Sequence, residues 1–200
     1  MTTSPERLQR WLDGFAARHG PVSRELDDRT LRLTAQDGAL AELEVPFPPL
    51  AGTLVEHVLR ERQVGVLLVR LGGSACGVFD GPRLVASKVT TRQVHGRSAA
   101  GGQSQQRFAR RRDGQVRVAL DAFADTAVRV LLPAVGSLDA VVTGGERTAV
   151  DAVLADRRLA ALRPLLTGRL LDGPDPRLTV LAASYDQLRA VWIRVVDAPD

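Results

Sequence analysis

Apolar residues in the first 62 positions are spaced for a helix, a hairpin and a second short helix. The i, i+3, i+4 and i+7 positions of one helix face are occupied by Leu8, Trp11, Leu12 and Phe15. Ser4-Pro5 favours a helix start and Gly20-Pro21 a stop. Apolar residues then alternate with polar ones over 31–33 and 43–45, around the turn sequence Asp37-Gly38. A short amphipathic helix is expected from about residue 53 to 62.

From residue 63 onward the pattern predicts an antiparallel meander followed by a long helix. Strands are expected over 64–71, 74–79 and 83–89, because the sequences between them favour turns. After a polar stretch over 90–104, apolar residues up to Leu131 follow one helix face. Asp113-Gly114 is a point at which this helix could break.

Beyond Pro133 the pattern alternates between strands and helices. Strands are expected over 138–142 and 166–171, with a helix through Val153 between them. A last helix is expected after Asp175-Pro176, with an apolar face that runs from Leu178 to Trp192 and lies in the core. This order predicts an α/β (α+β) fold, in which a mixed sheet has an antiparallel three-strand meander followed by β-α-β-α. Residues 1–62 are expected to be an N-terminal helix and hairpin extension, and 63–200 the main domain.

Composition places the chain among ordinary globular proteins. It has 200 residues, of which 44% are hydrophobic and 25% charged. No apolar run approaches the roughly 18 residues of a membrane span, and the N-terminus is polar, so we expect a cytoplasmic protein without a membrane partner. The single cysteine, Cys76, is expected to be a buried structural thiol. His19 and His57 are expected to be partly exposed, and no His/Cys or His/carboxylate cluster has the spacing of metal ligands.

Basic residues are distributed unevenly along the chain. The net charge is only +4, and Lys88 is the one lysine among 27 basic residues, as in proteins of GC-rich genomes. No acidic residue occurs between Asp80 and Asp113. The basic residues of this stretch are Arg83, Lys88, Arg92, Arg97, Arg107, Arg110, Arg111 and Arg112, with His95. The stretch fits either a solvated basic face or a surface that binds a polyanion.

A glycine-rich loop within this basic stretch carries candidate chemistry. Gly101-Gly102 permits backbone angles that other residues avoid and allows close approach to a ligand. Gln103 follows, and an amide cannot act as an acid or base near neutral pH. Its side chain can instead hydrogen-bond a water nucleophile or a developing oxyanion. Because a helix is expected to begin at Ser104, its backbone N–H groups favour a nearby anion. A partner would have to supply the rest of the active site.

The residues around the loop resemble the central domain of archaeal and eukaryotic class-1 peptide release factors. The matching segments are His95-Gly96-Arg97, Gly101-Gly102-Gln103-Ser104 and Arg107-Phe108-Ala109-Arg110. The order of elements over 64–195 also agrees, which implies the RNase H-like architecture of that domain. In that family the glutamine lies in the peptidyl-transferase centre of the ribosome and positions the water that attacks the peptidyl-tRNA ester.

The sequence differs from the release-factor pattern in three ways, and these differences indicate a more specific family. Ser98-Ala99-Ala100 is inserted between the two motifs. Residues 1–62 are too short for a stop-codon-reading domain, and no residues after Trp192 match the domain that binds the GTPase partner. What remains resembles the release-factor-like peptidyl-tRNA hydrolases of ribosome-associated quality control, of the VLRF type, in particular short actinobacterial members. In those proteins Thr91-Arg92 leading into a glycine-rich loop with one glutamine recurs.

The resemblance implies a hydrolase that releases nascent chains from stalled ribosomes without reading a stop codon. Its catalytic residues would be Gln103, Gly102 and Gly101. The residues expected to bind RNA are Arg92, His95, Arg97, Ser104, Arg107, Arg110, Arg111 and Arg112. The implied partners are the large ribosomal subunit at its peptidyl-transferase centre, peptidyl-tRNA and rRNA. No metal and no small-molecule cofactor is expected, and the location is cytoplasmic and ribosome-associated.

Other functions stay open at the level of sequence. The protein could be a non-catalytic ribosome- or RNA-binding module, or a nuclease that cleaves tRNA near its acceptor end. The meander strands carry no acidic cluster, which disfavours two-metal nuclease chemistry. Gly144-Gly145-Glu146 before a helix could form a phosphate-binding turn, although it lacks the full spacing of a nucleotide-binding fingerprint.

Overall fold

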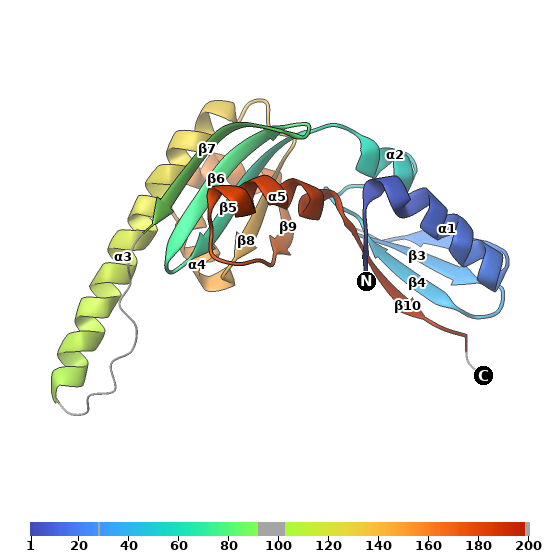
Figure 1. Ribbon diagram of the computed structural model, residues 1–200, viewed down its shortest axis with the longest axis horizontal. Helices are drawn as coiled ribbons and strands as arrows, with labels where there is room; N and C mark the ends of the chain where they lie inside the picture. Colours follow the sequence, from blue (N-terminus) through green and yellow to red (C-terminus); the bar gives the residue numbers. More distant parts are fainter. Residues whose placement is uncertain (28, 92–102, 199–200) are drawn as a thin grey trace. The chain divides into compact units, whose positions relative to one another are not determined.

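The chain folds as two units, each with its own sheet and hydrophobic core (Figure 1). A computed structural model describes residues 1–27, 29–91 and 103–198, with side chains described throughout except at 103–111. The first unit is Met1–Glu61 with Asp186–Asp200, and the second is Arg62–Tyr185. The C-terminal segment therefore belongs with the N-terminal unit, whereas the sequence predicted a single domain over 63–200.

The first unit is an antiparallel sheet with helices packed on one face. Its strand order is β1-β10-β4-β3-β2. The elements are β1 (Thr2–Thr3), α1 (Pro5–His19), β2 (Val22–Leu26), β3 (Thr30–Ala35), β4 (Leu40–Glu44), α2 (Leu54–Leu59) and β10 (Val191–Val196). The apolar face of α1, with Leu8 and Phe15, packs on sheet residues such as Leu43. The predicted helices and hairpin are confirmed, and β1, β2 and β10 are additional strands.

The residues around Trp192, which were predicted to end the last helix, form strand β10 instead. Helix α5 (Leu178–Arg189) ends earlier than predicted, and Trp192 lies in β10. Val191 and Ile193 face the core, so the alternating side chain of Trp192 faces the other way and is 57% exposed. The prediction of Trp192 in a helical core stripe was wrong, because its spacing from Leu188 fits a helix while the β-branched run also fits a strand.

The second unit contains a mixed five-stranded sheet of order β7-β6-β5-β8-β9. Strands β5, β6 and β7 form the antiparallel meander, and β8 and β9 run parallel to β5. Its elements are β5 (Gln63–Arg70), β6 (Gly73–Asp80), β7 (Arg83–Thr91), α3 (Gln103–Leu131), β8 (Ala140–Gly145), α4 (Arg147–Leu154), β9 (Leu166–Leu171) and α5, with short 3-10 helices at Leu132–Ala134 and Arg157–Leu165. The predicted fold class is confirmed.

Helices cover both faces of this second sheet. Along β6, Cys76 and Val78 belong to the core formed with α3. Side chains alternate along a strand, so Gly77 and Phe79 lie on the opposite face, toward α5. The ring of Phe79 lies 5.5 Å from that of Tyr185 in this helix. On the same face, a Cβ at Gly77 would come within 3.0 Å of a methyl group of Leu181. Strand β6 is therefore buried on both faces, which explains its unbroken run of buried residues.

Helix α3 extends well beyond the sheet on which it packs (Figure 1). It has 29 residues and continues through Asp113-Gly114, so the helix does not break there. Among its described side chains, burial begins at Ala119, whereas residues 112–118 are partly or fully exposed. From Gln103 to Ala119 the helix rises about 24 Å, at about 1.5 Å per residue. We call this part of α3, residues 103–118, the arm.

The buried side chain of His57 joins α2 to the turn that precedes it. His57 is 2% exposed, so the predicted surface position was wrong. Its Nδ1 accepts a hydrogen bond from the backbone N–H of Ala51 at 3.2 Å. Its Nε2 donates to the carbonyl oxygens of Pro46 at 2.7 Å and Phe47 at 3.2 Å. Because one ring nitrogen accepts and the other donates, this geometry fits the neutral imidazole with its proton on Nε2.

The substitution His57→Leu is expected to lower the free energy of unfolding of the first unit by at least about 2 kcal/mol. It keeps an apolar side chain in place but leaves the buried carbonyl groups of Pro46 and Phe47 and the partly buried N–H of Ala51 without their partner. Each buried group left unpaired costs about 1–3 kcal/mol. Urea unfolding followed by circular dichroism measures the loss. The control is His19→Leu, since His19 bonds only to the exposed carboxylate of Asp37 at 2.8 Å and should cost less than about 1 kcal/mol. Equal losses in the two variants would contradict this role of His57.

Candidate functional site

The predicted catalytic loop connects the edge strand β7 to the arm of α3. Strand β7 ends at Thr91, and α3 begins at Gln103. Gln103 is therefore the first residue of the helix, one position earlier than the predicted start. The predicted loop residues outside the described part of the chain are Arg92, His95, Arg97, Gly101 and Gly102.

The other predicted RNA-binding residues lie on the arm of α3. They are Ser104, Arg107, Arg110, Arg111 and Arg112, and side chains are described from Arg112 onward. Arg112 is partly exposed and forms no ion pair with another described residue. The first turn of α3 contains no acidic residue. Since a helix N-terminus carries a partial positive charge, arginines near it oppose the helix dipole. The arm is thus electrostatically unfavourable by itself.

The opposite end of α3 has a different charge pattern. Here the carboxylate of Asp125 lies 2.8 Å from the guanidinium of Arg158, which also contacts Asp156 at 2.7 Å. Hydrogen bonds that the guanidinium donates to Asp156, and then to Asp125, raise the pKa of Arg158 above its ordinary value. The carboxylate of Asp125 is therefore compensated within the unit. The basic residues of α3 that belong to the acid-free stretch of the sequence lie toward the N-terminal end of the helix.

A partly buried pair of hydroxyl groups holds the end of β7 against α3. The Oγ1 atoms of Thr90 and Thr126 are 2.7 Å apart, and Thr126 Oγ1 donates to the carbonyl of Ala122 at 3.0 Å. Since a hydroxyl carries one proton, Thr90 is the donor in the bond between the two side chains. This bond lies one residue before the end of β7 and about 35 Å along the helix axis from Gln103. No signal in the sequence marks this pair, because its members are 36 positions apart and belong to no motif.

Two other candidates from the sequence have structural explanations. Cys76 is fully buried, and burial raises the pKa of its thiol, so the predicted structural role is confirmed. A Cβ at Gly144 would lie 2.7 Å from a methyl group of Leu68 and 2.9 Å from the carbonyl oxygen of Leu171. Gly145 has a φ of 96°, and a Cβ there would collide with the backbone of Val69. Close packing of the parallel strands therefore accounts for both glycines without a phosphate ligand.

Metal ligation and membrane insertion find no support in the described part of the chain. Within residues 1–27, 29–91 and 103–198, no three His, Cys, Asp or Glu side chains are grouped so that they could hold a metal ion. None of the helices described there combines the length and apolar character that crossing a membrane requires.

Two solved structures match part of this chain at low sequence identity. The crystal structure of the archaeal translation termination factor aRF1 matches with a TM-score of 0.49 and 17% identity, over 78% of this chain and 51% of that chain. A second structure, described as an archaeal protein, matches with a TM-score of 0.47, 17% identity and the same coverage. The chain thus spans about half the length of these structures. No curated protein matches the chain.

A family model gives the assignment. The model described as Actinobacteria/chloroflexi VLRF1 release factor matches residues 62–194, which include the whole second unit. The match covers more than half of the sequence and contains both the loop and the arm. The chain therefore belongs to the VLRF1 release factor family of Actinobacteria and Chloroflexi.

Proposed function

We propose that this protein hydrolyses peptidyl-tRNA on the large ribosomal subunit and releases nascent chains from stalled complexes without reading a stop codon. The observation that carries the proposal is the position of Gln103 at the N-terminal end of the arm. A helix that leaves its own domain by about 24 Å can deliver this residue to a deep site in another particle. Membership of a release factor family supports the ribosome as that particle.

The chemistry assigned to Gln103 is the positioning of water. An amide neither takes nor gives a proton near neutral pH, so the side chain acts by hydrogen-bonding the attacking water or the oxyanion that develops at the ester. The N–H groups in the first turn of α3 favour negative charge at the same end. Gly101 and Gly102 precede Gln103 and let the chain approach the substrate closely. The tRNA and the ribosome would supply the remaining groups, and no metal or cofactor is part of the proposal.

Binding of RNA is assigned to the positive charge of the loop and arm. The proposed residues are Arg92, His95, Arg97, Ser104, Arg107, Arg110, Arg111 and Arg112. Clustered arginines at a helix N-terminus destabilise that end of the free helix, and contact with phosphates would reverse this effect. Counterion release from RNA would add a salt-dependent contribution to binding. The protein would therefore be found with ribosomes.

The variant Gln103→Ala is expected to slow release of nascent chains from stalled large subunits by at least about 100-fold, the usual cost of losing one oxyanion donor. Its co-sedimentation with the subunits should be unchanged, because the arginines remain. The matched control is Gln105→Ala, which removes the same amide two residues along the helix and should leave the rate within about twofold. Release by Gln103→Ala at the wild-type rate would refute the proposed role.

The products of the same reaction separate the proposal from its two alternatives. Ester hydrolysis leaves tRNA with an intact 3′ terminus, which can be re-aminoacylated. A shortened tRNA in the wild-type reaction would identify a nuclease instead. Salt-sensitive binding to ribosomes with neither product would identify a non-catalytic binding module.

A double-mutant cycle on Thr90→Val and Thr126→Val is expected to give a coupling energy of about 0.5–1.5 kcal/mol in urea unfolding of the second unit. The two hydroxyls form one hydrogen bond, and valine keeps the shape of each side chain while removing it. The rate of release should also fall in Thr90→Val, because the strand end that leads into the loop loses its attachment to α3. Thr91→Val is the control, since Thr91 is exposed on the same strand and should change stability by less than about 0.5 kcal/mol. A coupling energy of zero would rule out this attachment.

A further inference from the structure

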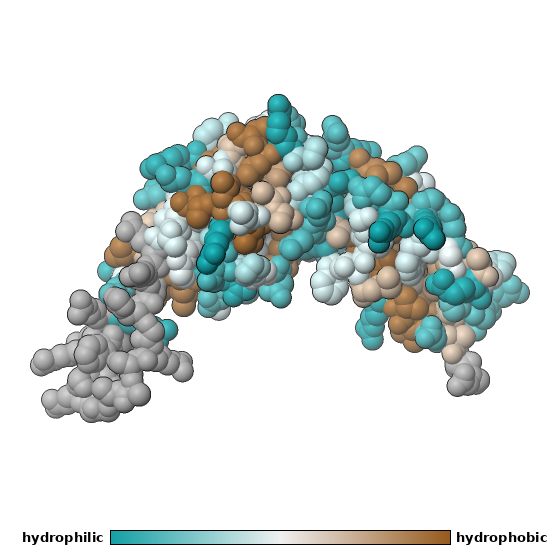
Figure 2. All heavy atoms as spheres, viewed as in Figure 1, coloured by the Kyte–Doolittle hydropathy of each residue, from teal (hydrophilic) through white to brown (hydrophobic). Residues whose placement is uncertain are grey.

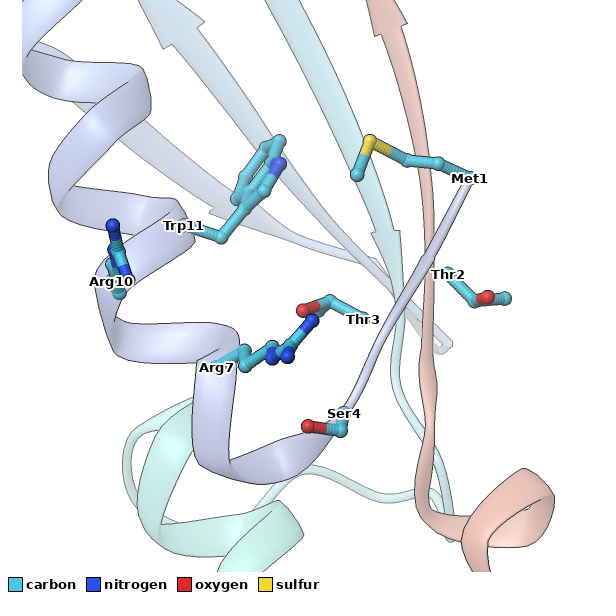
Figure 3. Close-up of a pocket in the computed structure, with 7 residues that line it drawn as sticks. All are labelled: Met1, Thr2, Thr3, Ser4, Arg7, Arg10 and Trp11. Atoms are coloured by element: carbon cyan, nitrogen blue, oxygen red, sulfur yellow. The ribbon is translucent and has the colours of Figure 1, made fainter.

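A groove in the first unit runs between the strand segment at the N-terminus and helix α1 (Figure 3). Its volume is about 690 Å³, within the range of small-molecule and nucleotide sites. On the helix side it is lined by Arg7, Arg10 and Trp11, and on the strand side by residues that include Met1 and Thr3. Figure 3 shows Arg7 extended toward Thr3, and the indole of Trp11 turned toward Met1.

The groove carries positive charge that the first unit does not neutralise. Arg7 and Arg10 are exposed, and neither forms an ion pair with another described residue. No carboxylate lines the groove. Glu6, the acidic residue in the first turn of α1, lies 3.2 Å from Arg189 instead, and hydrogen bonds to its own backbone N–H and to Ser4 lower its pKa. The two guanidinium groups are therefore available for an anion, and a guanidinium suits phosphate well.

The aromatic side of the groove is held in place by packing. The indole of Trp11 stacks on Phe15, with ring centroids 5.5 Å apart and an angle of 14° between the planes. Phe15 itself is fully buried in the core of the unit. Trp11 is only partly buried, so a ring of fixed orientation borders the groove. Flat aromatic rings next to arginines are the groups that bind unpaired bases and their phosphates in single-stranded nucleic acids.

We propose that this groove binds single-stranded RNA, with Arg7 and Arg10 on neighbouring phosphates and one base against Trp11. The two arginines are three positions apart on α1, which places them side by side on one helix face. RNA is favoured over an acidic peptide because the groove offers a stacking surface as well as charge. It is favoured over a duplex because paired bases are already stacked. The groove lies outside the segment that the release factor family covers, so it would be a second RNA contact, separate from the loop and arm.

Fluorescence of Trp11 gives a readout that is local to the groove. The chain has two tryptophans, so the full-length Trp192→Phe protein reports on Trp11 alone. The probe is an oligouridylate of about ten nucleotides, in the range of roughly 4–16 that a single-strand site accommodates. We expect saturable quenching of Trp11 emission whose midpoint shifts to higher RNA concentration as salt is raised.

Charge reversal tests the two arginines against a matched control. In the Trp192→Phe background, Arg7→Glu/Arg10→Glu should raise the RNA concentration at half-maximal quenching at least tenfold. The plot of the logarithm of this concentration against the logarithm of the salt concentration should also become less steep, by about 1.4, because each lost phosphate contact removes about 0.7. Arg24→Glu/Arg29→Glu makes the same change in net charge at exposed positions of the same unit and should stay within about twofold. Should the first variant fail to fold by circular dichroism, Arg7→Gln/Arg10→Gln replaces it.

Three results would overturn the proposal. They are absence of quenching by the oligouridylate, an equal effect of the two double variants, and quenching at least as strong with polyglutamate. Because the assay uses free RNA and no ribosome, its outcome is independent of whether Gln103 supports hydrolysis. Failure of the release assay and failure of this assay are thus distinguishable.

Discussion

Burial of the C-terminal part of α3 against the mixed sheet is the interaction on which the proposed active site depends. Phe123, Ala127 and Leu131 are fully buried and contact the core residues of β5 and β6. Among the described side chains of this 29-residue helix, burial begins at Ala119, and continuous backbone hydrogen bonds make the helix stiff along its length. The direction in which Gln103 is presented is therefore set by packing that lies far from it. Loss of volume in this core would displace the N-terminal end of α3 more than its anchored C-terminal end.

The charge at the N-terminal end of α3 is opposite to what the stability of the helix alone favours. Acidic residues near the N-terminus would complement the helix dipole, yet the arm carries arginines there and the compensated Asp125 lies at the other end. Segments that serve a function often carry residues that lower the stability of the helix or strand to which they belong. The anchored end tolerates this arrangement because apolar burial supplies its stability, whereas the arm gains a surface suited to phosphate.

Features governed by local sequence were predictable, and features governed by distant pairing were not. Turn sequences at 72–73 and 80–82 located the meander, and the 3.6-residue period located α3, because each signal lies within a few residues of the element that it defines. The loop could be recognised because its motif residues lie close together in the sequence around Gln103. The Thr90–Thr126 bond joins positions 36 apart, and the contacts of His57 depend on a turn that folds back on α2. Neither leaves a periodic pattern.

The strand that the sequence misassigned also determines how the first unit is built. β10 lies between β1 and β4, and Met1 exchanges backbone hydrogen bonds with Ile193 in both directions. Residues from both ends of the chain are therefore needed to complete this sheet, and the whole second unit lies between them in the sequence. Pairing of β1 with β10 closes a loop of nearly the whole chain, which costs conformational entropy before any contact forms. We therefore expect the first unit to fold after the second. The groove on α1 includes Met1 and Thr3, whose strand is paired with β10. Its shape consequently depends on residues that follow the second unit in the sequence, even though none of the charges in the groove comes from them.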